Sequence, residues 1–340
     1  MLATLGECWQ RVEPPEHGYR VQPEQAEAVA RQVLDAMLTR PFRVGKSPTE
    51  DEYSQLLARV RHWVARGRSI RIKIGYAPMK NPNAVRSSRA DWSEFFALCH
   101  LCQWHHKVRA IYPPGLRIKI IFDDATILMA NRADPGPMDS YISSMRQLIA
   151  AMGYQSLIVG VMRQSWFAWL FHFGPYQLAE RRVLHWERDA ANRPLIEKMD
   201  EGARRNLALP AGLPPEEQER RWREASHRYR VYWEALQLSG LPRLGKSLIG
   251  MYLDGTQHHI RQQAAFHLTS VGKGQVTQPW QGEGVLWDNG KGLLVPIVLT
   301  AGRRQRMAIK EIRHLNFLRL PGFDTIATCR EIDPGGETEH

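Results

Sequence analysis

Three strand-like segments alternate with two helix-like segments between residues 69 and 162. In the first strand, 69–74, isoleucine alternates with arginine and lysine; the second, 117–124, begins in the same way, and the third, 156–162, is almost wholly apolar. The segments between them, 91–110 and 138–152, carry apolar residues at helical spacing. This alternation predicts a parallel sheet covered by helices, with ligands bound at the carboxyl ends of its strands.

We therefore expect an α/β fold: a Rossmann-like, mostly parallel sheet covered by helices, with a smaller helical and β-containing C-terminal portion. Helical patterns at 23–39 and 49–66 precede the sheet, another follows at 214–238, and Asn289-Gly290 between apolar runs predicts a late β-hairpin. The 340 residues suffice for one large domain or two modest ones. The expected parts are N-terminal helices at 1–66, an α/β core at 67–195, a helical segment at 196–245 and a β-containing portion at 246–340.

The chain is basic, with a formal net charge of +11, which indicates an anionic partner or substrate. Its lysines and arginines are dispersed, which favours small anions in a pocket over a nucleic-acid track, unless a basic patch assembles in three dimensions. The amino terminus lacks the pattern of a signal peptide, and the most apolar stretch, 156–171, is interrupted by Arg163 and Gln164. We expect a cytoplasmic, reduced protein that binds neither membranes nor nucleic acid.

A stiff loop presents a lysine shortly after the first strand. Lys80 stands between Pro78 and Pro82, and a proline restricts both its own backbone and that of the preceding residue. Amide and cationic side chains follow and an aromatic ring precedes; these candidate substrate contacts are Tyr76, Asn81, Asn83, Arg86 and Arg89. Cationic and amide donors at a strand end form the kind of clamp that binds phosphate. The alternative is a solvated surface turn.

Two adjacent carboxylates end the second strand. Asp123 and Asp124 point to opposite sides of an extended chain, so one faces the ligand while the other caps or is solvated. A carboxylate there can accept a proton if its pKa is tuned, whereas an ordinary pair of loop aspartates is the alternative. Farther along, Trp280 lies between Pro279 and Gln281, an arrangement suited to holding a ring or closing a pocket, although a core tryptophan is the simpler interpretation.

Cysteine and histidine cluster at Cys99, Cys102, His105 and His106, and these side chains have metal-ligand chemistry. On one continuous helix, however, they alternate with large apolar anchors, and buried cysteines are common core residues. We therefore expect no metal site. The stretch GLPRLGKS at 240–247 fits the spacing of a phosphate-binding loop, but it follows a helix rather than a strand and is interpreted as a coincidence.

At these same places the sequence resembles the isocyanide (isonitrile) synthase family, also described as pyoverdine/dityrosine biosynthesis proteins. The resemblance rests on APMKNPN at 77–83, on AIYPPGLRIKIIFDD at 110–124, on Tyr141 in the following helix and on QPWQG at 278–282. The first three features cover roughly 69–150, whereas 165–270 matches nothing recognisable.

The resemblance implies an enzyme that condenses the α-amine of an amino acid, typically tyrosine or tryptophan, with the ketone of ribulose 5-phosphate. The second carbon of the sugar becomes the isonitrile carbon. The resemblance implies neither a metal nor an organic cofactor, and it implies a neighbouring iron/2-oxoglutarate oxygenase that processes the product. Such a reaction needs a free amine, proton removal and support for developing oxyanions.

Carried over residue by residue, the resemblance implies that Lys80 contacts the phosphate or the sugar carbonyl and that Asp123 handles protons or anchors the amine. The expected substrate-binding residues are Tyr76, Asn81, Asn83, Arg86, Arg89, Asp124, Tyr141, Trp280 and Gln281. The sequence departs from the family pattern at Met79, Asn81, Asp124 and Gln281, which leaves open both the amino acid and whether the product is an isonitrile.

Two other functions fit parts of the sequence. A non-catalytic protein that binds a phosphorylated metabolite would use the same lysine loop without proton transfer. A nucleic-acid binder would draw on the net charge of +11 and the eleven tryptophans, but no recognisable binding motif accompanies them, so we rank this function last.

Overall fold

A computed structural model gives the arrangement of most of the chain. It describes residues 9–14, 18–39, 48–80, 85, 87–122, 124, 128, 134–163, 165, 175–207, 209–210, 212–238, 249–251, 265–266, 279–291, 293–314 and 318–332. Four of the expected site residues lie outside these ranges: Asn81, Asn83, Arg86 and Asp123. The stretch at 240–247 that resembles a phosphate-binding loop also lies outside them.

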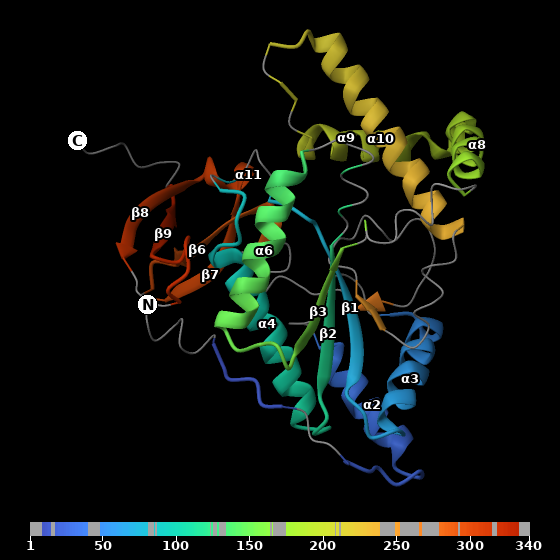
Figure 1. Cartoon of the computed structure of the whole chain (residues 1–340), viewed down its shortest axis with the longest axis vertical. Coiled ribbons are helices and arrows are strands. Elements are labelled where there is room, and N and C mark those ends of the chain that lie inside the picture. The colour runs from blue at the N-terminus through green and yellow to red at the C-terminus, as the bar shows by residue number, and fades with distance from the viewer. Residues whose placement is uncertain are drawn as a thin grey trace.

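A five-stranded parallel sheet forms the centre of the molecule (Figure 1). Its strands are β1 (Ile70–Tyr76), β2 (Leu116–Phe122), β3 (Ile158–Arg163), β4 (Ile249–Met251) and β5 (Ala265–Phe266). The strand order is β3-β2-β1-β4-β5, and every neighbouring pair is parallel. The expected Rossmann-like sheet is therefore confirmed. Because the chain leaves β1 first to one side and later to the other, β1 lies at the topological switch point where such sheets bind ligands.

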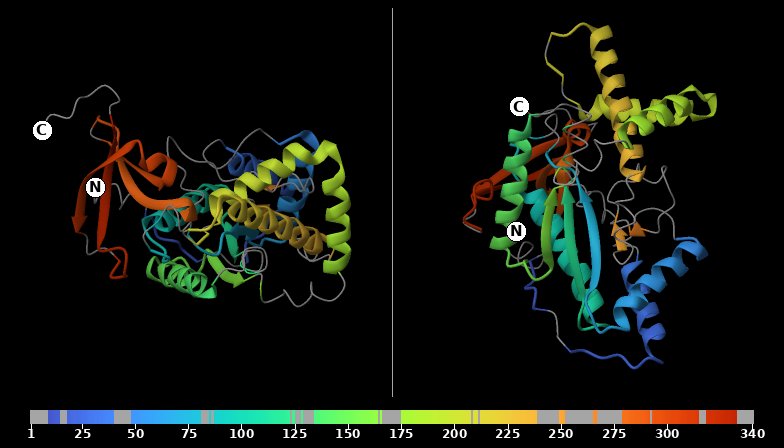
Figure 2. Two further views of the ribbon diagram at one scale, coloured as in Figure 1. Left: turned by 90° about the horizontal axis from the view of Figure 1, so that it is seen from above. Right: turned by 45° about the vertical axis from the view of Figure 1, so that its right-hand side comes forward.

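Helices cover both faces of this sheet, as the alternation predicted. They are α2 (Ala26–Met37), α3 (Glu50–Val64), α4 (Trp92–Arg109) and α6 (Pro135–Ala151). Helices α4 and α6 lie on one face, and α3 packs on the other against β1 and β4 (Figure 2). The turn after α4 is the Tyr-Pro-Pro-Gly segment, in which Gly115 has a φ of +59° and returns the chain into β2. Residues with a side chain rarely adopt this conformation.

Helix α4 is the central helix of the fold, because it lies between the two sheets that the described residues form. Its apolar residues point in all directions, and Phe95, Leu98, Leu101 and Trp104 are all fully buried. A helix that is apolar on every side is expected to be enclosed on every side. Its neighbours are β2 and α6 on one side and β6 and β7 on the other. Its cysteines, Cys99 and Cys102, are buried among these core residues.

The C-terminal β-layer, residues 279–332, is a second sheet of four strands. It contains the 3₁₀ turn η6 (Pro279–Gln281) and the strands β6 (Gly282–Asp288), β7 (Leu294–Thr300), β8 (Met307–His314) and β9 (Thr325–Glu331), with the short helix α11 (Ala301–Arg304). The order is β7-β6-β9-β8. Strands β6 and β7 form the hairpin predicted from Asn289-Gly290, and Gly290 adopts a positive φ of +76° in its turn.

A group of helices lies beyond the carboxyl ends of β1–β3 (Figure 1). It consists of α8 (Pro175–Arg188), η3 (Ala190–Asn192), α9 (Arg193–Asn206) and α10 (Pro215–Leu238). Arg230 on α10 ties the three longer helices together, because its guanidinium contacts Glu187 on α8 at 2.6 Å and Asp200 on α9 at 3.3 Å. None of the helices in the described ranges has the length and apolar character needed to cross a bilayer.

The sequence boundary expected at residue 245, between the helical segment and the β-containing portion, does not coincide with the boundary between the two sheets. Strands β4 and β5 come after it in sequence, yet they extend the central sheet, with β4 paired to β1. They have three and two residues, too few for a periodic pattern to identify them from sequence.

Candidate functional site

The loop that carries Lys80 leaves the central sheet at its switch point. Strands β1 and β2 are paired along their whole length, and Tyr76 and Phe122 at their carboxyl ends are register partners. Lys80 follows β1 closely, and Asp123, which is not among the described residues, follows Phe122 directly in sequence. The parallel pairing therefore brings the ends of the two predicted site segments to the same edge of the sheet.

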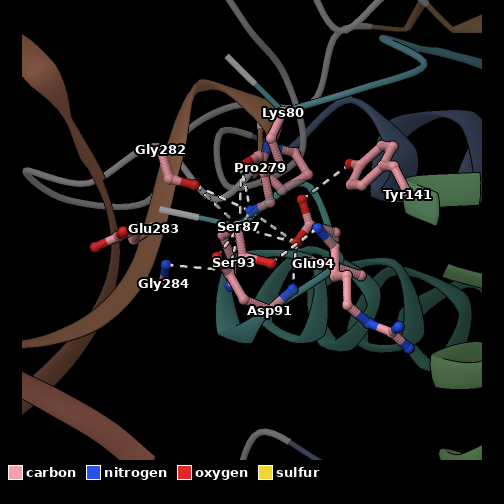
Figure 3. Close-up of polar contacts among 12 residues, drawn as sticks. Lys80, Ser87, Asp91, Ser93, Glu94, Tyr141, Pro279, Gly282, Glu283 and Gly284 are labelled. Atoms are coloured by element: carbon pink, nitrogen blue, oxygen red, sulfur yellow. Dashed lines mark hydrogen bonds and ion pairs between the residues drawn. The ribbon is translucent and has the colours of Figure 1, made fainter. Parts of the chain in front are cut away.

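The ammonium group of Lys80 is buried among five protein oxygen atoms (Figure 3). The side chain is 1% exposed, and its Nζ lies 2.8 Å from a Glu94 carboxylate oxygen and 3.1 Å from an Asp91 carboxylate oxygen. Ser93 Oγ lies at 2.5 Å, and the carbonyl oxygens of Pro279 and Gly282 accept hydrogen bonds at 3.2 and 3.0 Å. An ammonium group has three N–H donors, so every donor has an acceptor within the protein.

Both carboxylates belong to the N-terminal cap of α4. Asp91 accepts a hydrogen bond from the Ser93 backbone N–H at 2.7 Å, and the Asp91 backbone N–H donates to Glu94 at 2.8 Å. Asp91, the N-cap residue, and Glu94 also form a capping box, in which each side chain accepts a hydrogen bond from the backbone N–H of the other and otherwise unpaired donors at the helix start are satisfied. The cap fixes both carboxylates at one point, and Lys80 fits between them.

Helix α6 holds this capped end in place. Tyr141 donates its hydroxyl to the second Glu94 oxygen at 2.9 Å, so both oxygens of that buried carboxylate are hydrogen-bonded. One turn farther along the helix, Ser144 accepts a hydrogen bond from the Ala90 backbone N–H at 2.8 Å. Tyr141, which the family resemblance identified, therefore contacts the same carboxylate as Lys80.

The C-terminal β-layer closes the other side of the cluster. Its first residues supply the Pro279 and Gly282 carbonyls, and the Gly284 backbone N–H donates to Asp91 at 3.3 Å. Gly284 permits this approach because a Cβ atom there would lie 2.1 Å from the Ser93 backbone nitrogen. Strand β6 thus rests directly on the backbone of α4, an approach available only to a residue without a side chain.

The cluster keeps a fixed positive charge next to carboxylates in a dry environment. Burial alone would lower the pKa of Lys80, but the Asp91 and Glu94 carboxylates outweigh it and raise that pKa above its usual value. Burial raises the pKa of Glu94, and Lys80 opposes that rise. The pKa of Tyr141 lies well above its usual value because of burial and the nearby Glu94 carboxylate. Tyr141 therefore remains a neutral hydroxyl donor at physiological pH.

A row of aromatic rings lies next to the polar cluster. The Tyr76 ring lies 5.1 Å from Trp280 and 6.0 Å from Phe122, and Phe122 lies 5.8 Å from Tyr141, in edge-on arrangements. All four side chains are buried, with Trp280 the most exposed at 8%. Three of the predicted contacts, Tyr76, Tyr141 and Trp280, thus belong to one row of buried rings that Phe122 completes.

The other described candidates have different surroundings. Asp124 is fully buried and forms an ion pair with Arg163 Nε at 2.7 Å, and it also accepts a hydrogen bond from the Ser165 backbone N–H at 2.9 Å. Arg89 donates to Gln147 on α6 at 3.2 Å, and its buried Nε has no hydrogen-bond partner among the described residues. Gln281 ends the 3₁₀ turn beside Trp280.

The sequence reasoning missed Ser93 and Glu94. Glu94 had a usable signal, since an acidic residue three positions after an aspartate N-cap is the pattern of a capping box. Ser93 had none, because its role depends on Pro279 and Lys80, which are distant in sequence. Among the described residues, no three or more His, Cys, Asp or Glu side chains are placed so that they could hold a metal ion. In the cysteine–histidine cluster, His105 Nδ1 accepts a hydrogen bond from the Leu116 backbone N–H at 3.1 Å.

Comparison with known proteins finds one matching family model and a solved structure with a similar fold. Residues 60–184 match the family model described as pyoverdine/dityrosine biosynthesis protein. The chain is similar to the crystal structure of the PvcA protein from Pseudomonas aeruginosa, with a TM-score of 0.62 and 16% identity over 88% of this chain and 99% of that one. At this identity the likeness shows a shared fold.

A second solved structure, a tyrosyl-tRNA synthetase from Archaeoglobus fulgidus complexed with L-tyrosine, aligns with 64% of this chain and 61% of its own. Its TM-score of 0.31 at 15% identity is too low to indicate a common fold. No curated protein matches the chain in sequence.

The matched segment, 60–184, begins in α3 and ends in α8. It contains β1 to β3, the Lys80 loop, the cap of α4 and Tyr141, and the family model that it matches describes biosynthetic proteins, which supports an enzymatic role. The resemblance to pyoverdine/dityrosine biosynthesis proteins, predicted from the lysine loop and the Tyr-Pro-Pro-Gly strand, is therefore confirmed.

Proposed function

We propose that this protein is an isonitrile synthase-like enzyme that joins the α-amine of an amino acid to ribulose 5-phosphate in a pathway of secondary metabolism. The observation that carries the proposal is the convergence of three sequence-distant segments on one cluster. The lysine loop, Tyr141 and the turn containing Trp280 were each identified from the family resemblance, and they meet around Lys80 and Glu94.

The reaction requires an anionic sugar and an amine to bind next to each other. In this proposal they bind at the edge of the sheet where β1 and β2 end. The amine nitrogen attacks the ketone carbon of the sugar and water leaves, which forms an imine without an oxidant. Because that carbon ends bound to nitrogen alone, both of its carbon–carbon bonds must then break. Each cleavage needs a proton acceptor and a positive environment for the developing oxyanion.

The residues with the matching chemistry follow β1 and β2. In this proposal Asp123 accepts protons or anchors the amine, because it directly follows the strand end that is paired with β1. The amides of Asn81 and Asn83 and the guanidinium groups of Arg86 and Arg89 bind the phosphate. A pathway iron/2-oxoglutarate oxygenase would act on the product.

Isotope transfer tests the proposal directly. The purified protein is incubated with ribulose 5-phosphate labelled with ¹³C at its second carbon and with each amino acid in turn, and the products are analysed by mass spectrometry. The expected product has gained one carbon and lost two hydrogens relative to the amino acid, and it carries the label. Asp123→Asn should abolish product formation while the melting temperature stays close to that of the parent protein.

A protein that binds the sugar phosphate in a thermal-shift assay yet gives no labelled product with any amino acid would be a metabolite-binding protein instead. A labelled product that retains further sugar carbons would identify a related amine–sugar condensation.

A further inference from the structure

The surroundings of Lys80 point to a role other than direct contact with a substrate. Within the described part of the chain, five oxygen atoms lie within 3.2 Å of its Nζ. For a phosphate oxygen to approach, at least one of these contacts must be displaced. Displacement is costly, because each carboxylate or carbonyl left without a donor remains in a desolvated site.

The five oxygens come from two parts of the chain: the start of α4 and the first residues of the C-terminal β-layer. Pairing within the central sheet does not hold these two parts together. Asp91, Ser93 and Glu94 belong to the start of α4, whereas Pro279 and Gly282 lie 199 and 202 residues beyond Lys80. Lys80 itself follows β1. One ammonium group therefore joins the switch-point strand, the central helix and the C-terminal β-layer (Figure 3).

We infer that Lys80 is a positioning residue: its buried ammonium holds the C-terminal β-layer, and with it Trp280, against the carboxyl end of β1. Trp280 lies between the two carbonyls that accept from Lys80, and its ring packs on Tyr76 at the end of that strand. Loss of the ammonium would release the turn that carries Trp280 and, with it, the contact between the Trp280 and Tyr76 rings. The inference deepens the function proposed above, and only its activity measurement rests on that function.

A charge-balanced pair of variants separates positioning from direct catalysis. Lys80→Met keeps the length of the side chain but leaves two carboxylates facing each other without a cation. We expect its melting temperature to fall by about 10 °C and protease release of the C-terminal β-layer to become faster. Lys80→Met combined with Glu94→Gln also removes one carboxylate, so we expect most of the loss in melting temperature to be recovered.

Turnover of the double variant then decides the role of the lysine. If Lys80 is a positioning residue, activity should stay within about tenfold of the parent, or about 1.4 kcal/mol, once the cluster has regained the net charge that it has in the parent. A folded double variant whose turnover is reduced by more than about 1,000-fold would mean that Lys80 acts on the substrate, and would overturn the inference. Lys80→Met with an unchanged melting temperature and unchanged proteolysis would overturn it as well.

Lys310 provides a matched control, because it is a lysine of the C-terminal β-layer that pairs with the Asp288 carboxylate at 3.1 Å. Its side chain is 55% exposed, so Lys310→Met should change neither the melting temperature nor the proteolysis. The same contrast can be measured without any substitution. Reductive methylation of the native protein, mapped by mass spectrometry, should modify Lys310 readily and leave Lys80 unmodified.

Equal modification of the two lysines in the absence of sugar would show that the Lys80 ammonium is accessible, and would refute the inference even if the variants fail to fold. Melting, proteolysis and methylation need no substrate. If the protein forms no product from ribulose 5-phosphate, the proposed function is disproved. These three measurements would still decide the role of Lys80.

Discussion

Replacing Gly284 with alanine places a methyl group where β6 rests on the first turn of α4. The new Cβ atom would lie 2.1 Å from the Ser93 nitrogen and 2.2 Å from the Trp92 carbonyl carbon. Both are backbone atoms, so no side-chain rotation relieves the contact. Strand β6 must move away by more than about 1 Å to reach an ordinary non-bonded distance.

That movement disrupts the polar cluster on which the C-terminal β-layer is held. The Gly284 N–H bond to Asp91 and the Lys80 bond to Gly282 are already 3.3 and 3.0 Å long, so a shift of this size breaks or weakens both. Overpacking costs about 1–3 kcal/mol, and a lost hydrogen bond to a charged group costs about 1.5–3 kcal/mol. Together they correspond to a fall of roughly 10 °C in the melting temperature.

Thermal unfolding followed by circular dichroism measures this effect. Gly202→Ala is the matched control, because Gly202 lies in α9 and a Cβ atom there meets nothing within 4 Å. Alanine is favoured over glycine inside a helix by about 1 kcal/mol, so the control should melt at or slightly above the parent temperature. If Gly284→Ala melts within about 2 °C of the parent, β6 does not rest on α4 as described, and the account of the cluster fails.

Two further predictions concern buried titratable groups. Burial lowers the pKa of His105 to about 4, so the unfolded chain takes up a proton at a higher pH than the folded protein does. The contribution of neutral His105 to the free energy of unfolding is therefore fully present above pH 6.5 and is lost as the pH falls toward 4, by up to about 3 kcal/mol. His105→Gln should flatten the free energy of unfolding over that range in denaturant titrations, and an unchanged pH profile would contradict the assignment. Asp124→Asn should lower the free energy of unfolding by about 2 kcal/mol, because Arg163 loses a buried partner. Asp139 pairs with the same arginine but is 57% exposed, so Asp139→Asn should cost less than about 0.5 kcal/mol, and equal effects of the two variants would refute the distinction.

Much of the fold could be read from the sequence, because the signals are local. The alternating isoleucines of β1 and β2 and the apolar spacing of α2 and α3 each report a period that a few consecutive residues carry. The strand–helix alternation then left a parallel sheet as the expected arrangement. The Asp91 cap and the Asn289-Gly290 turn were likewise predictable, since both depend on neighbours within a few positions.

The surroundings of Lys80 were decided only by the tertiary structure. Proline on both sides indicated that the lysine is held in place, and the resemblance implied contact with the phosphate or the sugar carbonyl, but neither signal could identify its neighbours within the protein. Its actual neighbours come from a helix cap and from a turn about 200 residues away, and they meet only because Gly284 lets β6 settle on α4. A lysine is normally exposed, and it is buried here because two carboxylates compensate the loss of its hydration. That compensation is a property of packing between distant segments, which no local pattern records.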